Sequence, residues 1–263
     1  MTVLAKAADL AGRALHGVGR IADRYGSYAF LDARQAELGG VLPLDLEAVI
    51  LAVAGTNPGF TFVQIGAHVG EEGDPLTGCI RAKGLRGVLV EPQAAAFAAL
   101  QRNYADQPQL HFEQAAIAPT DGTIKFYRAD PEFWAAHGLP PGIDTQISAL
   151  DPAQIRFHVD LFGGKALAER ESEYLRFDEI PALTLVSLLA KHGIARPNLL
   201  QIDTEGFDFE IIKMVDWSNP PDLIHYETVH LSVVDRKMSW DLLRSKGYRL
   251  FATNVYNTLA VRA

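Results

Sequence analysis

The stretch that decides the fold is 61–75, TFVQIGAHVGEEGDP. Phe62, Val63 and Ile65 predict a short buried strand, and Gly66 and Gly70 mark a tight turn directly after it. Glycine suits such a turn because its backbone adopts angles that a side chain forbids, and because it lets a ligand lie against the main chain. The N–H groups that begin the next helix would then face the ligand. The stretch therefore predicts the strand, glycine loop and helix of a nucleotide-type site.

Composition narrows the class of protein. The chain has 263 residues, of which 48% are hydrophobic and 21% are charged, as in an ordinary globular α/β domain. The net charge is −8 and no basic run is present, which disfavours a nucleic-acid partner. Cys79 is the only cysteine, which excludes an intrachain disulfide or a thiolate metal cluster. No apolar run approaches a membrane span or a signal peptide, so we expect a cytoplasmic protein with no membrane span that acts on a small molecule.

The amino-terminal residues predict a helical extension over residues 1–56. Apolar side chains recur every three or four positions over residues 3–25, with both charge signs between them, which predicts an amphipathic helix. Its ordinary use is packing on the domain or on a second subunit, so a homo-oligomer through this helix is one expectation. A second helix is expected over residues 44–54.

The remainder, 57–263, predicts a single domain in which strands alternate with helices. Such alternation implies a mostly parallel sheet covered by helices on both faces. The last two strands have no helix between them, which implies one antiparallel strand. Asp121 and Gly122 predict a hairpin turn into an antiparallel strand. The expected strands are 61–65, 87–91, 110–116, 123–128, 199–203, 222–227, 248–252 and 258–262, and the later helices are 92–104, 184–192, 207–215 and 235–246.

Residues 129–180 interrupt this alternation of strands and helices. They contain several prolines, a Gly-Gly pair, a charged run and scattered aromatic residues, without clear periodicity. So long an irregular span in a compact domain is more often functional than a plain loop. We predict an inserted cap that recognises the acceptor substrate.

Polar residues stand where the predicted strands end, and in a parallel sheet those ends meet at one edge. Glu91 ends the second strand about twenty residues after Gly70, the separation at which a carboxylate can accept both hydroxyls of a ribose. An alternative is a solvated acid at a strand end. Asp203 and Glu205 follow a later strand and could hold a cofactor amine or take a proton from a hydroxyl. Alternatively, Asp203 only caps the next helix, and Glu205 or Asp208 only favours the positive end of that helix.

Glu227 and His230 follow the next strand. His230 is the better candidate for a general base, because the unperturbed pKa of histidine lies near neutrality. A lone histidine is, however, more often structural. Asp203, Glu205, Glu227 and His230 could also ligate Mg²⁺ or a similar ion, although their spacing matches no metal motif.

Taken together, these blocks resemble the FkbM-type methyltransferases, a family with the class I S-adenosylmethionine-dependent fold. The matching segments are FVQIGAHVG with the following DP, GVLVEP, LQRNY, QAAIA, IPALTLVSLL, LLQIDTEGFDFEII, DLIHYETVHLS and a late GY and TLA. The resemblance implies a Rossmann-like seven-stranded sheet with the last strand antiparallel. It also implies transfer of a methyl group to a hydroxyl of a sugar, polyketide or related metabolite. No NPPY-type motif is present, which favours oxygen over nitrogen as the acceptor.

The resemblance also implies which residues bind the cofactor and line the site of methyl transfer. Gly66 and Gly70 would flank its methionine part, Glu91 would bind the ribose, and Asp203 with Glu205 would line the transfer site. From the residues themselves, we nominate Asp203 or His230 as the base, with Glu205 and Glu227 as orienting groups. Departures from the family pattern occur at His68, Val69, Val186 and Asn257. Gln114 and Ala115 would border the adenine. The full set of expected cofactor-binding residues is Gln64, Gly66, Ala67, His68, Gly70, Asp74, Glu91, Pro92, Gln114, Ala115 and Asp203.

Two other functions remain open at this point. A nicotinamide-dependent oxidoreductase also uses a glycine turn and an acid after the second strand, although GAHVG and the DTEG block disfavour it. A non-catalytic protein of the same fold would bind the cofactor without turnover, because a fold by itself does not establish activity.

Overall fold

In the computed structural model the chain is described over residues 44–263 except 71–73, 142, 144–146 and 255. The helix expected over 3–25 lies outside the described residues. The described residues form two compact units. We call 44–124 with 179–263 the sheet unit and 125–178 the insert unit. In chain order the elements are α3 (Leu46–Thr56), β1 (Thr61–Ile65), α4 (Thr77–Lys83), β2 (Arg86–Val90), α5 (Ala94–Asn103), β3 (Leu110–Glu113), β4 (Ala116–Ile117), β5 (Gly122–Ala129), α6 (Pro131–Ala136), α7 (Pro152–Gly163), α8 (Lys165–Ala168), α9 (Glu171–Tyr174), β6 (Leu175–Leu183), α10 (Leu185–Lys191), β7 (Leu199–Ile202), α11 (Asp208–Lys213), β8 (Leu223–Glu227), α12 (Val233–Ser245), β9 (Tyr248–Ala252) and β10 (Asn257–Arg262).

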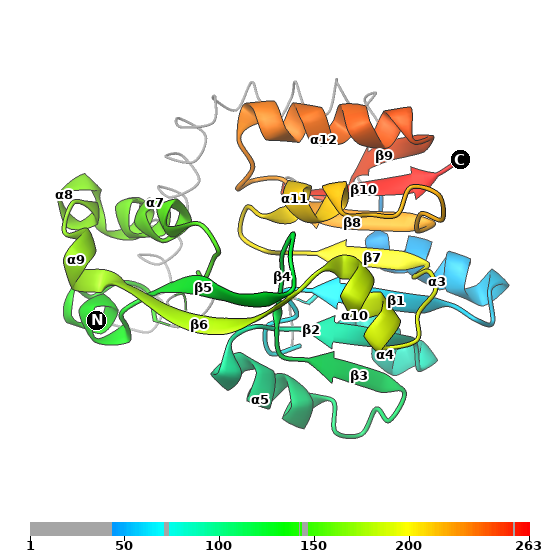
Figure 1. Cartoon of the computed structure of the whole chain (residues 1–263), viewed down its shortest axis with the longest axis horizontal. Coiled ribbons are helices and arrows are strands. Elements are labelled where there is room, and N and C mark those ends of the chain that lie inside the picture. The colour runs from blue at the N-terminus through cyan, green and yellow to red at the C-terminus, as the bar shows by residue number, and fades with distance from the viewer. Residues whose placement is uncertain (1–43, 71–73, 142, 144–146, 255) are drawn as a thin grey trace, which may run out of the picture. The chain divides into compact units, whose positions relative to one another are not determined.

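The sheet unit is built on a seven-stranded sheet in the order β3-β2-β1-β7-β8-β10-β9. Figure 1 shows these strands one above another, from β3 at the bottom to β9 at the top. β1, β2, β3, β7 and β8 pair in parallel, whereas β10 pairs antiparallel with both β8 and β9. The expected mostly parallel sheet with an antiparallel last strand is therefore confirmed. That last strand inserts between β8 and β9.

The strands of the sheet centre are apolar because both of their faces are covered. Every residue of β7 is buried, as is every residue of β1 after the first. α3 starts at the N-cap Asp45, whose side chain accepts a hydrogen bond from Ala48 N, and it packs against α4 and the sheet core. Cys79 lies in this core, and burial raises the pKa of its thiol to about 11, so it fills space and is not a nucleophile.

Two predicted strands are paired differently from expectation. The strand expected over 110–116 is confirmed only for 110–113. β3 ends at Glu113, and the extension to 116 is wrong because β4 belongs to a separate three-stranded sheet. β5 begins at the predicted turn, but β6 lies between β4 and β5. The expected hairpin with the preceding strand is therefore also wrong. The neighbour of β4 comes from more than fifty residues farther along the chain, and no local turn motif reveals such a partner.

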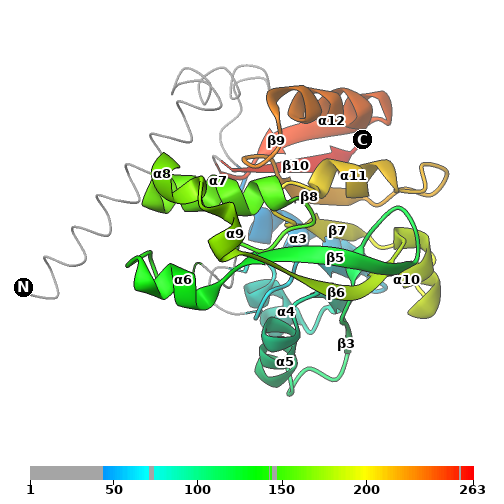
Figure 2. The same cartoon turned by 60° about the vertical axis from the view of Figure 1, so that its left-hand side comes forward.

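The insert unit contains regular helices that the sequence pattern did not predict. α7 begins at Asp151, whose side chain accepts a hydrogen bond from Ala153 N, and Pro152 follows at the first helical position. Its buried residues are spread around the helix, so no single apolar stripe marks it. α7 and α8 lie side by side (Figure 2), and this unit has an apolar core of its own that includes Trp134 and Tyr174. None of the described helices has the length and apolar character needed to cross a bilayer.

Candidate functional site

The candidate site lies at the carboxyl ends of β1, β2, β7 and β8. Ile65 is level with Val90 on one side and with Ile202 on the other, and Ile202 is level with Tyr226. The residue after each strand, or the last residue of β8, therefore reaches the same edge. The structure brings Gly66, Glu91, Asp203 and Glu227 to that edge, as the sequence predicted.

The glycine loop, residues 66–70, is held by close contact with protein. Gly66 has φ +82°, and a Cβ there would lie 1.7 Å from the backbone oxygen of Asp203. Gly70 has φ +62°, and its Cβ would lie 2.3 Å from a ring carbon of Tyr104. The backbone angle and the tight packing both require glycine. Asn103, the last residue of α5, also donates from Nδ2 to Val69 O at 2.8 Å, so α5 helps to fix the loop.

A buried polar pair supports the start of this loop. Gln64 Nε2 donates to Asp74 Oδ2 at 2.6 Å, and Leu76 N donates to Asp74 Oδ1 at 2.7 Å. Burial raises the pKa of Asp74. Gln64 Oε1 is buried and receives no hydrogen bond from any part of the chain that the structure describes. An oxygen in that position can accept a hydrogen bond from a ligand.

Glu91 joins the glycine loop to the end of β2. The side chain is only 3% exposed. Oε2 accepts from His68 N at 2.9 Å, and Oε1 accepts from Gln93 N at 2.8 Å. Burial raises the pKa of Glu91 to about 7, against the lowering effect of these two bonds. Each carboxylate oxygen keeps a further lone pair that could accept a hydrogen bond from a ribose hydroxyl. Ribose binding by Glu91 stays a prediction.

The remaining expected cofactor residues lie beside these groups along the chain. Ala67 is buried, and its N–H donates to Val90 O together with that of Gly66. Pro92 follows Glu91. Gln114 and Ala115 follow β3, the neighbour of β2; Gln114 is exposed and Ala115 is buried. Their contact with an adenine ring stays a prediction.

The acid cluster, Asp203, Glu205 and Glu227, forms the other part of the site. One carboxylate oxygen from each lies within 4.8 Å of the others. Asp203 is accessible to solvent, yet partial loss of hydration and the nearby charges of Glu227 and Asp208 raise its pKa well above the usual range. Burial and the charge of Glu227 also raise the pKa of Glu205, and burial raises that of Glu227 to about 7. Three such oxygens suit a divalent ion, and metal binding stays a prediction.

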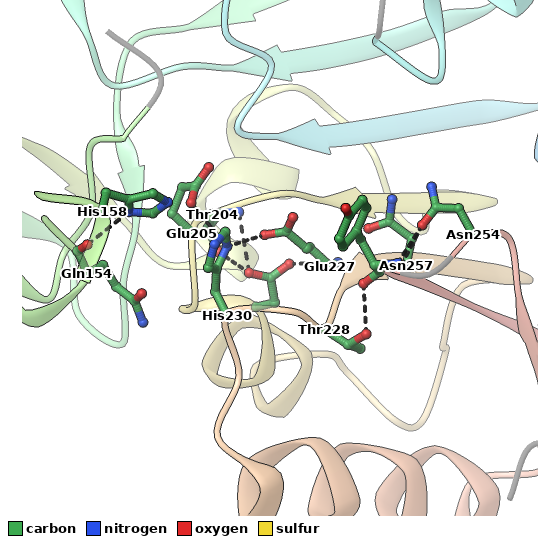
Figure 3. Close-up of polar contacts among 11 residues, drawn as sticks. Gln154, His158, Thr204, Glu205, Glu227, Thr228, His230, Asn254 and Asn257 are labelled. Carbon is green, nitrogen blue, oxygen red and sulfur yellow. Dashed lines mark hydrogen bonds and ion pairs between the residues drawn. The ribbon is translucent and has the colours of Figure 1, made fainter. Parts of the chain in front are cut away.

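His230 completes this cluster (Figure 3). Its Nδ1 lies 2.7 Å from Glu227 Oε2 and 3.1 Å from Glu205 Oε2. Burial lowers the pKa of His230 to about 4, so the ring is neutral at pH 7. The hydrogen bond with Glu227 favours the tautomer with the proton on Nδ1. Nε2 is then the basic nitrogen.

Asp208 and Thr204, which the sequence analysis does not assign to the site, connect the loops of the acid cluster. Asp208 is fully buried and accepts hydrogen bonds from Thr204 and from Glu227 N. From the sequence, Asp208 was interpreted only as a charge that favours the start of a helix. Its position between Phe207 and Phe209, in an apolar stretch, was the available signal, because a charge there requires a partner.

Comparison with protein-family models identifies one family. The model of the Methyltransferase FkbM domain matches residues 64–250, well over half of the chain. Among solved structures, the crystal structure of Methyltransferase FkbM from Methylobacillus flagellatus KT is similar, with 14% sequence identity and a TM-score of 0.45. The match covers 77% of this chain and 43% of that one, so this chain spans less than half the length of that protein. A search of curated protein sequences finds no match.

Proposed function

Since the chain belongs to the FkbM methyltransferase family, we propose that it is an S-adenosylmethionine-dependent enzyme that methylates a hydroxyl oxygen of a sugar, polyketide or related small metabolite. The observation that carries this proposal is the position of His230. Its Nδ1 forms a hydrogen bond with Glu227 and lies 3.1 Å from Glu205 Oε2, at the same sheet edge as the glycine loop and Glu91. A neutral, oriented imidazole beside a cofactor-type loop is suited to removing a proton from an acceptor hydroxyl.

The residues of the glycine loop fit the proposed cofactor. Gln64 Oε1 is a buried acceptor that lacks a hydrogen bond among the described residues, and a cationic amine would satisfy it. Glu91 has lone pairs left for the paired hydroxyls of a ribose. When bound, S-adenosylmethionine supplies an electrophilic methyl group on a sulfonium. We assign its binding to Gln64, the glycine loop and Glu91.

The acid cluster would orient the acceptor and accept its proton. In this proposal Nε2 of His230 takes the hydroxyl proton. Nδ1 keeps its own proton and donates it in a hydrogen bond to Glu227. The ionised form of Glu227 would stabilise the imidazolium that forms. Asp203, whose backbone packs against Gly66, is the alternative base. The protein mainly aligns the acceptor with the methyl group and excludes water.

Calorimetric titration with S-adenosylhomocysteine, beside NAD⁺, tests the cofactor assignment. Tight binding of the first ligand alone, weakened in Glu91→Ala, is the expected result. Binding of NAD⁺ instead would favour the oxidoreductase alternative. Absence of binding by either ligand, or no effect of Glu91→Ala, would contradict the cofactor site. A panel of hydroxylated acceptors with labelled S-adenosylmethionine, with and without Mg²⁺, then tests methyl transfer, with His230→Gln as the inactive control.

Other expectations stay proposals. They are acceptor selection by residues 129–180, a cytoplasmic location, the absence of a nucleic-acid partner, and a homo-oligomer formed through the amino-terminal helix.

A further inference from the structure

Asp208 is a fully buried carboxylate whose hydrogen bonds join two loops of the site. It is 0% exposed and is the first residue of α11. Its Oδ2 accepts from Thr204 Oγ1 at 2.8 Å and from Thr204 N at 3.3 Å. Its Oδ1 accepts from Glu227 N at 3.1 Å. One side chain therefore ties the loop after β7 to the end of β8.

The directions of these bonds differ from those expected of a residue that only stabilises its own helix. A residue that stabilises a helix start accepts from N–H groups of that helix or acts through the helix dipole. Asp208 instead accepts hydrogen bonds from Thr204, which precedes α11, and from Glu227 at the end of β8. Burying a carboxylate is costly unless it is fully hydrogen-bonded. Here the cost of burying Asp208 is offset by hydrogen bonds from Thr204 and Glu227, and both of these residues belong to the loops that carry the acid cluster.

Both partners of Asp208 are adjacent to the groups that hold His230. Thr204 stands between Asp203 and Glu205, and Glu205 has an unusual φ of +54°. Glu227 supplies the carboxylate 2.7 Å from His230 Nδ1 (Figure 3). A shift of either loop would change the distances from His230 to both carboxylates.

We propose that Asp208 is a positioning residue that fixes Glu205 and Glu227 relative to each other and so orients His230 for proton transfer. This inference rests on the proposed methyltransferase function. Asp208 does not touch the reacting groups; it acts through the backbone of Glu227 and through Thr204.

Kinetics of the full-length chain test this role. Asp208→Asn keeps the shape but turns one acceptor into a donor, so we expect kcat to fall about a hundredfold while KM for S-adenosylmethionine changes less than about twofold. Thr204→Val removes one hydrogen bond and should lower kcat about tenfold, and Thr204→Ser should restore it. The control is Glu210→Gln, which removes the same charge from an exposed position of α11, where Glu210 pairs with Lys213. It should leave kcat unchanged.

A second readout does not depend on turnover. In ¹⁵N spectra of the histidine side chains, assigned with His230→Gln, the wild-type His230 ring should be protonated at Nδ1. Asp208→Asn and Thr204→Val should weaken this preference, and Glu210→Gln should not. If no acceptor is methylated by the wild-type chain, the proposed function fails, and the spectra still decide the role of Asp208. If Asp208→Asn does not fold, Thr204→Val decides. An unchanged His230 signal in every soluble variant, or an equal loss of kcat and cofactor affinity, would overturn the proposal.

Discussion

The glycine loop after β1 and the acid cluster after β7 and β8 lie at the same edge of the sheet, but different contacts hold them. In the glycine loop, main-chain groups dominate. Two positive-φ glycines meet protein atoms, and Glu91 is held by backbone N–H groups. In the acid cluster, side chains from separate loops contact one another directly, as His230 contacts Glu205 and Glu227.

This difference predicts different responses to substitution. Where backbone geometry determines the structure, an added methyl group should affect folding and cofactor binding first. Where side chains meet across loops, a near-isosteric exchange should affect catalysis while the fold stays intact. The predictions below test this contrast, from the largest expected effect to the smallest.

His230→Gln should lower kcat about a thousandfold, because the site loses its base. This equals about 4 kcal/mol of activation free energy. Steady-state kinetics with labelled S-adenosylmethionine measure the effect, and cofactor affinity should change little. The matched control is His111→Gln at an exposed position of β3. If His230→Gln keeps more than a tenth of wild-type kcat, Asp203 becomes the preferred base.

Gly66→Ala should destabilise the fold by about 4 kcal/mol, because positive φ and overlap with the backbone oxygen of Asp203 act together. Denaturant unfolding measures this. Gly84→Ala is the control that separates the two causes. Gly84 also has positive φ, +59°, but nothing lies within 4 Å of its Cβ. It should lose only about 1 kcal/mol. Equal losses at the two positions would show that the contact with Asp203 is unimportant.

Glu91 should make stability depend on pH. Its pKa is raised from 4.5 to about 7 by burial, so between these values the folded chain binds more protons than the unfolded chain. The contribution of Glu91 to the free energy of unfolding should therefore fall by about 3 kcal/mol as pH rises through this window, and this contribution should level off above pH 7. Glu91→Gln should give a flatter curve, measured by unfolding between pH 4.5 and 8.

The curve of this variant should not be completely flat. Burial also raises the pKa of Glu227 to about 7 and that of Asp208 to about 6, so both acids contribute with the same sign. Parallel curves for Glu91→Gln and wild type would show that Glu91 is not buried in solution.

Tyr104→Phe should cost about 1 kcal/mol of stability, because it loses only the hydrogen bond to Thr77 Oγ1 at 2.8 Å. The ring contact with Gly70 remains. A double-mutant cycle with Thr77→Val isolates the bond, since the two effects should not add. Additive losses would mean that the two hydroxyls act separately.

The sequence predicted most of the sheet because its signals are local. Apolar runs and glycine turns placed β1, β2, β7, β8 and β9 within about two residues, and the missing helix before β10 predicted an antiparallel strand. The position of β10 between two earlier strands was not predictable in this way. The sequence did not predict the helix α7, because its buried residues lie on several sides of the helix and form no single apolar stripe. It did not predict β4, because the strand that pairs with β4 is far along the chain.

In the candidate site the same distinction holds. The residue types and their spacing in sequence identified Glu91, Asp203, Glu227 and His230 as groups at strand ends, since parallel strands bring those ends to one edge. Only the tertiary structure decided which of them meet. It placed His230 Nδ1 between two carboxylates and buried Asp208 between two loops. Such contacts depend on register and on the order of strands, and both are set by packing over the whole sheet, because no single segment carries them.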